Sequence, residues 1–125
     1  MSKRLHVLLV DDDPTLRRAV ARLLSVRAEV TVADTLESAK EHLSTALELP
    51  HVVLSDVDLG TGSGFDLAEH VRVAHPPLYS RVILMSGEPD AGELDARARA
   101  SGLRLLQKPF AAETFFATVE RLDSQ

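Results

Sequence analysis

The chain contains no cysteine and no tryptophan, and its other aromatic residues are one tyrosine and four phenylalanines. Without cysteine, the protein can have neither a disulfide framework nor a thiolate metal site, and it cannot use a cysteine nucleophile. Hydrophobic residues still make up 45% of the 125 residues and charged residues 26%, which is ordinary for a soluble globular protein. We expect one domain that spans residues 1–125.

The chain also lacks an excess of positive charge and any long hydrophobic run. Its formal net charge of −5 argues against direct nucleic-acid binding, which needs a basic surface. No stretch approaches the ~20 apolar residues of a membrane span. The N-terminal "MSKRLHVLLVDDD" reaches three aspartates too early for the ~7–15-residue apolar region of a secretory signal. We therefore expect a cytoplasmic protein without a membrane partner.

Five short runs rich in valine, isoleucine and leucine recur along the chain. They lie at residues 5–10, 29–33, 51–55, 81–86 and 103–107. The first, third and fourth are nearly continuous, as in strands that are buried on both faces of a parallel sheet. The second alternates between apolar and polar residues, which predicts a more exposed strand.

Segments with apolar residues at helical spacing follow these runs. They cover residues 14–26, 35–47, 64–75, 91–102 and 111–125. Pro14 suits the first position of a helix, and Pro76 and Pro77 end the third segment. Strand and helix thus alternate five times. This order predicts a doubly wound α/β fold, with a five-stranded parallel sheet flanked by five helices.

The polar residues at the ends of the strands are the candidates for a functional site, because sites in open α/β sheets lie beyond the carboxyl ends of the strands. They are Asp11, Asp12 and Asp13 after the first run, Asp56 after the third, Ser86 at the end of the fourth and Lys108 after the fifth. Each one alone has an ordinary explanation, since polar residues often end strands and aspartate is a favoured helix N-cap.

The crowding of carboxylates at one edge changes this interpretation. Neighbouring carboxylates repel one another, and their pKa values rise unless a cation lies among them. Their oxygen atoms suit Mg²⁺, which would neutralise the oxygens of a phosphoryl group. Lys108 would add a second positive charge, and Ser86 could donate a hydrogen bond to a phosphoryl oxygen. One carboxylate would remain free to attack phosphorus.

Four segments together resemble the receiver domain of two-component response regulators, over essentially the whole chain. They are "VDDDP" (10–14), "LSDVDLGTGSG" (54–64), "LMSG" (84–87) and "LQKPF" (106–110). The resemblance implies a CheY-like, flavodoxin-like sheet with the strand order 2-1-3-4-5, and a cis Lys108–Pro109 bond. It also implies a signalling protein that is not an enzyme, apart from catalysing its own phosphorylation and dephosphorylation.

The resemblance implies a role for each candidate residue. These roles are phosphoacceptor for Asp56, ligands of Mg²⁺ for Asp11, Asp12, Asp56 and the backbone carbonyl of Asp58, phosphoryl partner for Lys108 and switch hydroxyl for Ser86. The phosphoryl group would come from a sensor histidine kinase, a phosphotransfer protein or a small phosphodonor. It would shift the surface of the fourth helix, fifth strand and fifth helix toward a downstream output domain or target protein.

Several positions depart from the family pattern. Leu105 stands where an aromatic switch residue is usual, so we do not expect the usual ring rotation. Gly60 replaces a common proline and should make its loop more mobile. Thr118 stands where receivers of winged-helix transcription factors carry an arginine, which argues against their mode of dimerisation. Asp58 and Glu88 are both acidic, and we hypothesise that they tune the lifetime of the phosphoryl group.

Two alternatives remain at this stage. The segment "DVDLGT" (56–61) resembles the Asp-x-Asp motif of haloacid-dehalogenase-like phosphatases. That motif normally lies on the first strand, however, and the chain has neither the later acidic pair nor room for a cap domain. The other alternative is a pseudo-receiver, a binding module that never takes phosphate, which Leu105 keeps open.

Some features predict no chemistry. The five histidines are scattered and do not form a metal motif. Arg17, Arg18 and Arg22 are expected on a solvated helix face, which could also meet an acidic partner. Phe115 and Phe116 are adjacent, so we expect one of them to face away from the core.

Overall fold

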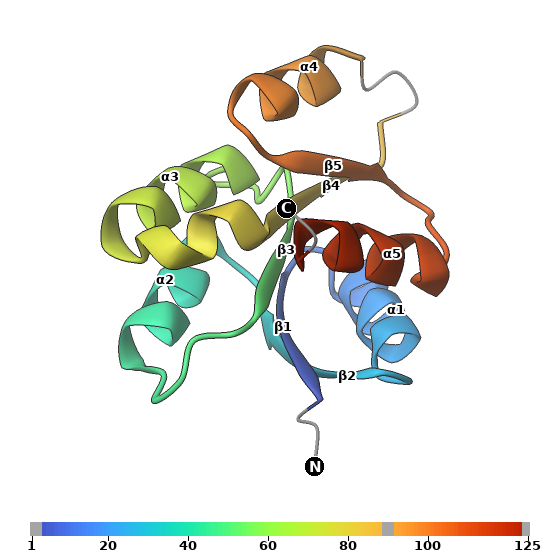
Figure 1. Cartoon of the computed structure of the whole chain (residues 1–125), viewed down its shortest axis with the longest axis horizontal. Coiled ribbons are helices and arrows are strands. Elements are labelled where there is room, and N and C mark those ends of the chain that lie inside the picture. Colours follow the sequence, from blue (N-terminus) through green and yellow to red (C-terminus); the bar gives the residue numbers. More distant parts are fainter. Residues whose placement is uncertain (1–3, 89–91, 124–125) are drawn as a thin grey trace.

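The computed structural model describes residues 4–88 and 92–123, and it shows a sheet with helices on both faces (Figure 1). The strands are β1 (Leu5–Val10), β2 (Ala28–Ala33), β3 (Val52–Asp56), β4 (Val82–Ser86) and β5 (Arg104–Gln107). The helices are α1 (Pro14–Leu24), α2 (Leu36–Thr45), α3 (Gly64–Ala74), α4 (Gly92–Ala100) and α5 (Ala112–Asp123), with the 3₁₀ helix η1 (Pro76–Arg81) before β4.

All neighbouring strands pair in parallel, in the order β2-β1-β3-β4-β5. The doubly wound sheet, its five α-helices and the strand order are thus confirmed. The sequence pattern did not anticipate η1, which begins at the two prolines that end α3. In the described part of the chain, no helix has the length and apolar character that crossing a membrane requires.

The near-continuous apolar runs are explained by two cores, one on each face of the sheet. Val7 and Leu9 of β1 pack toward α1 and α5, whereas Leu8 and Val10 pack toward α2 and α3. Successive side chains of a strand point to opposite faces, so a strand between two helical layers must be apolar at every position. The edge strand β2 is covered less completely, and Val32 on it is 50% exposed, as its alternation predicted.

The expectation that one of two adjacent phenylalanines faces away from the core is wrong. Phe115 is 0% exposed and Phe116 is 4% exposed, and their rings meet edge to face with centroids 5.1 Å apart. Successive helical residues differ by about 100° around the axis, so both fit within one wide apolar stripe of α5. The guanidinium of Arg27 covers the ring of Phe116, 4.4 Å from its centroid.

Two local features orient the loops at the carboxyl edge of the sheet. Asp13 caps α1, because its carboxylate accepts hydrogen bonds from the N–H groups of Thr15 and Leu16 at 2.9 and 3.2 Å. Ser63 and Asp66 form a reciprocal capping box that starts α3. Such caps satisfy N–H groups that have no partner within the helix. Both helices therefore begin at defined positions next to the strand ends.

Gly64 lets α3 begin against the end of β3. A Cβ atom at this position would lie 2.5 Å from the backbone oxygen of Asp56 and 2.9 Å from a methyl group of Leu84. We expect Gly64→Ala to displace α3 from the strand and to lower the free energy of unfolding by about 1–3 kcal/mol. Urea denaturation measures this change.

Gly87→Ala is the matched control for Gly64→Ala. A Cβ atom on Gly87 would come no closer than 3.7 Å to its nearest neighbour, Cε of Lys108, which is an ordinary contact. Its urea midpoint should remain close to that of the wild type. Equal unfolding free energies for Gly64→Ala and Gly87→Ala would contradict the close-contact argument.

Candidate functional site

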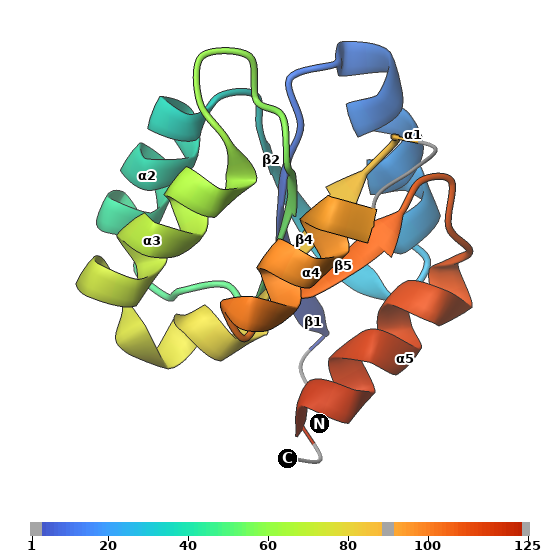
Figure 2. The same cartoon turned by 90° about the horizontal axis from the view of Figure 1, so that it is seen from above.

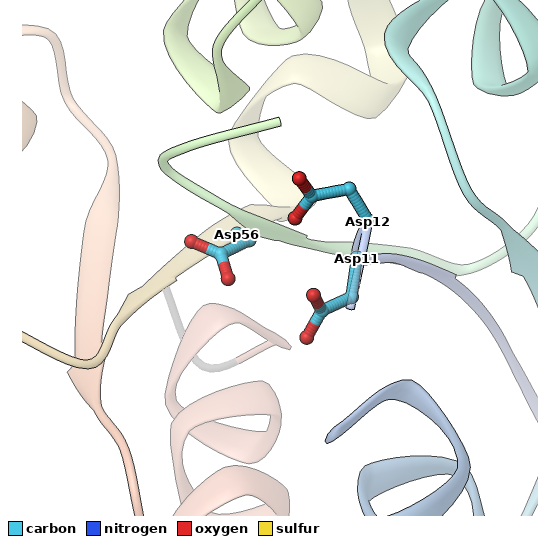
Figure 3. A group of neighbouring side chains, drawn as sticks. All are labelled: Asp11, Asp12 and Asp56. Carbon is cyan, nitrogen blue, oxygen red and sulfur yellow. The ribbon is translucent and has the colours of Figure 1, made fainter. Parts of the chain in front are cut away.

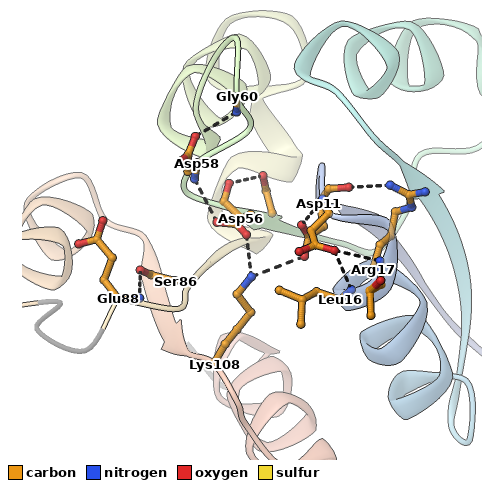
Figure 4. Close-up of polar contacts among 12 residues, drawn as sticks. Asp11, Leu16, Arg17, Asp56, Asp58, Gly60, Ser86, Glu88 and Lys108 are labelled. Carbon is orange, nitrogen blue, oxygen red and sulfur yellow. Dashed lines mark hydrogen bonds and ion pairs between the residues drawn. The ribbon is translucent and has the colours of Figure 1, made fainter.

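The parallel register brings the ends of four strands to one edge of the sheet. Val10 lies opposite Ser55, Asp56 opposite Met85, and Ser86 opposite Gln107. The residues that follow or end these strands therefore converge, although they are far apart in the sequence. Figure 4 shows Asp11, Asp56, Ser86 and Lys108 around this edge.

Three of the predicted residues form one acidic cluster. Carboxylate oxygens of Asp11, Asp12 and Asp56 lie within 4.8 Å of one another (Figure 3). Asp11 is fully buried, Asp56 is half-buried and Asp12 is exposed. Within residues 4–88 and 92–123, this is the one group of histidine and carboxylate side chains with a spacing that suits a metal ion.

The surroundings of the Asp11 carboxylate suit a bound cation better than a buried carboxylate with no cation beside it. Its Oδ1 accepts a hydrogen bond from the N–H of Asp13 at 3.0 Å, whereas its buried Oδ2 has no hydrogen-bond partner among the described residues. Burial raises the pKa of Asp11, and the charge of Asp56 adds to the rise, although the bond from Asp13 and the charge of Lys108 oppose it. A divalent cation would satisfy Oδ2 and offset this cost.

Lys108 reaches into the cluster from the end of β5. Its Nζ donates a hydrogen bond to Oδ2 of Asp56 at 2.7 Å and lies 3.6 Å from Oδ2 of Asp11. Burial lowers the pKa of Lys108, but the hydrogen bond and charge of Asp56, together with Asp11, outweigh burial and raise the pKa overall. Lys108 therefore remains a cation at neutral pH. The Lys108–Pro109 bond is cis, as expected.

The carboxylate of Asp56 is held from two sides. Besides the bond from Lys108, its Oδ1 accepts a hydrogen bond from the N–H of Asp58 at 3.0 Å. The side chain of Asp58 turns into its own loop, where it accepts a bond from the N–H of Gly60 at 3.0 Å. Gly60 has a φ of 77°, a region that favours glycine. Asp58 thus adds no carboxylate to the acidic cluster, and a metal contact through its backbone carbonyl stays a prediction.

A pocket of about 390 Å³ opens beside Asp56. Asp58, Ser86, Glu88 and Lys108 are among the residues that line it. The Oγ of buried Ser86 accepts a hydrogen bond from the N–H of Glu88 at 3.1 Å, and its carbonyl accepts one from the N–H of Lys108 at 2.8 Å. The two acidic residues of our lifetime hypothesis therefore both border the space next to Asp56.

Arg17 contributes to the site in a way that the sequence analysis missed. It was grouped with the solvated arginines of the first helix, but it is half-buried and donates a hydrogen bond to the carbonyl oxygen of Asp11 at 3.0 Å. This bond ties the first turn of α1 to the loop that carries the acidic pair (Figure 4). Helical periodicity does not reveal it, because the acceptor is a backbone atom outside the helix.

The raised pKa of Asp11 leads to a test of stability against pH. A carboxyl group whose pKa is raised in the folded state lowers the free energy of unfolding as the pH rises from its unfolded-state pKa through its folded-state pKa. This cost is absent below the ordinary aspartate pKa of 3.8. Without divalent cations, we expect Asp11→Asn to raise the free energy of unfolding at pH 7, because the buried charge is removed while the amide oxygen can still accept the hydrogen bond from the N–H of Asp13. The gain should vanish near pH 3.8. Urea denaturation at the two pH values measures it.

Asp12→Asn is the control for this experiment, because Asp12 belongs to the same cluster but is exposed. At pH 7, Asp12→Asn should change the free energy of unfolding less than Asp11→Asn does. A loss of stability in Asp11→Asn at pH 7 would show that the buried carboxylate is stabilising, contrary to the argument from burial.

Comparisons with known proteins agree with this geometry. The family described as response regulator receiver domain matches residues 7–120. The C4-dicarboxylate transport transcriptional regulatory protein DctD of Pseudomonas aeruginosa is 34% identical over 118 residues, which cover 93% of this chain and 24% of DctD. The sensory transduction protein LytT of Bacillus subtilis is 31% identical, with 94% of this chain and 47% of LytT covered. The chain thus spans less than half of either relative.

Solved structures show the same fold. The chemotaxis response regulator CheY4 of Vibrio cholerae superimposes with a TM-score of 0.79 at 27% identity, covering 96% of this chain and 99% of CheY4. The BeF3-activated DrrB receiver domain has a TM-score of 0.79 at 26% identity, covering 98% of this chain and all of that one. The match over residues 7–120, these relatives and the shared fold show that the chain belongs to the response regulator receiver domains, the signalling modules of two-component systems.

Proposed function

We propose that Asp56 of this receiver accepts a phosphoryl group in a Mg²⁺-dependent reaction. The arrangement of Asp56 carries the proposal: its carboxylate borders an open pocket, pairs with Lys108 at 2.7 Å and adjoins the acidic pair Asp11 and Asp12. A phosphatase of the haloacid-dehalogenase type is set aside, because the family match places the chain among receivers.

Asp56 acts as the nucleophile. One of its carboxylate oxygens forms a bond to phosphorus, while the bond between phosphorus and the donor breaks and the donor leaves with those electrons. The donor is the phosphohistidine of a sensor kinase or phosphotransfer protein, or a small acyl phosphate. The hydrogen bonds from Lys108 and the Asp58 N–H orient the carboxylate before the reaction. Water later attacks phosphorus, the bond between phosphorus and the carboxylate oxygen breaks, and inorganic phosphate leaves while the Asp56 carboxylate is restored.

Asp11, Asp12, Asp56 and the backbone carbonyl of Asp58 would hold Mg²⁺. Its charge, when it is bound, neutralises phosphoryl oxygens. Oδ2 of Asp11 supports this assignment, because this buried oxygen accepts no hydrogen bond from the described residues and has only the distant ammonium of Lys108, at 3.6 Å, to balance its charge. Lys108 remains protonated and can move from Asp56 to a phosphoryl oxygen, a shift that its flexible side chain allows.

Ser86 would carry the change away from Asp56. Its hydroxyl can donate to a phosphoryl oxygen, and its Oγ already accepts a bond from the N–H of Glu88. Gln107 of β5 donates to the carbonyl of Glu88 at 2.9 Å, so the loop after β4 and strand β5 are connected. An inward movement of Ser86 would therefore shift the surface formed by α4, β5 and α5. Leu105, packed against the core beneath α4, would move with it instead of an aromatic ring.

The phosphodonor protein would bind over α1 and the loop after β5. An apolar groove of about 430 Å³ lies there, lined by residues that include Leu16, Leu23 and Phe110. Gly87 and Lys108 line both this groove and the pocket at Asp56, so a protein seated in the groove would be next to the nucleophile. A downstream output domain or target protein would receive the signal. We place this chemistry in the cytoplasm and assign residues 1–125 to one receiver domain.

Incubation with Mg²⁺ and acetyl phosphate tests the nucleophile. We expect intact-protein mass spectrometry to show one added phosphoryl group, absent in Asp56→Asn and absent when EDTA replaces Mg²⁺. Asp66→Asn is the control, because Asp66 is an exposed aspartate of the α3 capping box, and it should still accept the group. An adduct that persists in Asp56→Asn contradicts the assignment, and a wild type without any adduct identifies a pseudo-receiver.

Asp58 and Glu88 are expected to control how long the phosphoryl group stays. Both border the pocket, so each adds negative charge beside the phosphoryl group. We expect Asp58→Asn combined with Glu88→Gln to change the decay rate of the Asp56 adduct by about threefold or more, since even a difference of ~0.7 kcal/mol in barrier produces this factor. Decay is followed by mass spectrometry after removal of acetyl phosphate.

Glu69→Gln serves as the control for the decay experiment. Glu69 is an exposed acid on α3 that pairs with Arg72, and its substitution should leave the rate unchanged. Decay rates that are identical in the double variant and the wild type rule out the lifetime hypothesis.

A further inference from the structure

A hollow of about 200 Å³ at the outer edge of β5 gathers arginines from three elements. Arg99 comes from α4, Arg104 from β5 and Arg121 from α5. Figure 2 shows β5 running between α4 and α5 on this side of the molecule. We call the hollow the arginine pocket and define it by Asp95, Arg99, Arg104, Leu105, Thr118 and Arg121.

The arginine pocket carries more positive than negative charge. Asp95 is the one carboxylate among its lining residues, and it is already paired with Arg99 at 2.8 Å. Arg104 and Arg121 have no ion pair with any residue that the structure describes, and Arg121 makes only a 3.4 Å contact with the hydroxyl of Thr118. This local excess stands out in a chain whose net charge is −5.

The lining of the arginine pocket favours a carboxylate. A guanidinium group pairs with a carboxylate through two parallel hydrogen bonds, and the pair is stronger where apolar side chains limit the access of water. Leu105 is partly buried in the wall of the hollow, and Thr118 is 2% exposed with its hydroxyl donated to the carbonyl of Thr114 at 2.8 Å. Arg104 and Arg121 are therefore its available donors.

We propose that the arginine pocket binds a glutamate or aspartate side chain from an acidic segment of the downstream partner protein. An apolar neighbour of that side chain would contact Leu105. Control of this binding by phosphorylation of Asp56 rests on the proposed function. The hydrogen bond from Gln107 to Glu88 would provide the connection, because it links β5 with the loop next to Asp56. The recognition chemistry itself depends on the arginines alone.

Two other occupants fit less well. A second copy in a symmetric dimer would place the same arginines opposite one another, and its one carboxylate in the pocket, Asp95, is already paired. Nucleic acid would meet the repulsion of an acidic protein. A short acidic segment carries few charges and can place them all beside Arg104 and Arg121.

The test is a titration of the ¹⁵N-labelled protein with a short blocked peptide of leucine and glutamate, followed by amide chemical shifts. We expect the shifts to concentrate on β5 and on the facing parts of α4 and α5. Binding should weaken on the order of tenfold when Arg104 and Arg121 are both replaced by glutamine, because two charge-assisted contacts are lost. Arg72→Gln on the exposed face of α3 is the matched control and should bind like the wild type.

Several outcomes would overturn the proposal. Chemical shift changes outside the pocket, or a peptide affinity of the Arg104→Gln/Arg121→Gln variant equal to that of the wild type, would do so. So would equal affinities for the glutamate peptide and for the same peptide with glutamine in place of glutamate. Tighter binding of a DNA duplex to the same residues, or a concentration-dependent dimer that buries the pocket, would replace the proposed occupant. Each titration is run with and without Mg²⁺ and beryllofluoride. Peptide binding that persists in Asp56→Asn supports the pocket even if phosphoacceptance fails, so the two proposals fail separately.

Discussion

The ion pair between Lys108 and Asp56 is the contact on which the carboxyl edge of the sheet depends. Three carboxylates converge there, and without a nearby cation their mutual repulsion would open the edge. Lys108 reaches two of them from β5, at 2.7 Å and 3.6 Å, and thereby connects β5 with the first and third strands. The same contact leaves part of the negative charge unbalanced, which suits the site for a cation and for the transfer of an anionic group.

The fold supports this contact through close approach and burial. Gly64 lets α3 begin against the backbone of Asp56, and the two hydrophobic cores hold the three inner strands β1, β3 and β4 in register. Arg17 ties α1 to the loop of Asp11, so helices on both faces constrain the acidic cluster. In a rigid scaffold of this kind, small movements of Ser86 and Lys108 would shift whole helices and strands, because packed elements move as units.

The surface of α4, β5 and α5 differs in chemistry from the site that would control it. The site is acidic and its carboxylates are spaced to suit a cation, whereas the arginine pocket is basic and lies at the sheet edge. Leu105 of β5 lies between the core and this pocket. Gln107, the last residue of the same strand, donates a hydrogen bond to the carbonyl of Glu88 in the loop after β4. One short strand therefore takes part in both features, and through it phosphorylation of Asp56, as proposed, would reach the outer surface.

The sequence by itself determined the five strands, the five α-helices and the residues that meet at the carboxyl edge, because hydrophobic period and strand-end position are local properties. It also placed the more exposed β2 strand correctly. Only the tertiary structure decided that both Phe115 and Phe116 are buried, that Arg17 bonds to a backbone carbonyl and that arginines from three elements share one hollow. These depend on distances between segments that are remote in the chain, and such distances exist only once the helices are packed on the sheet.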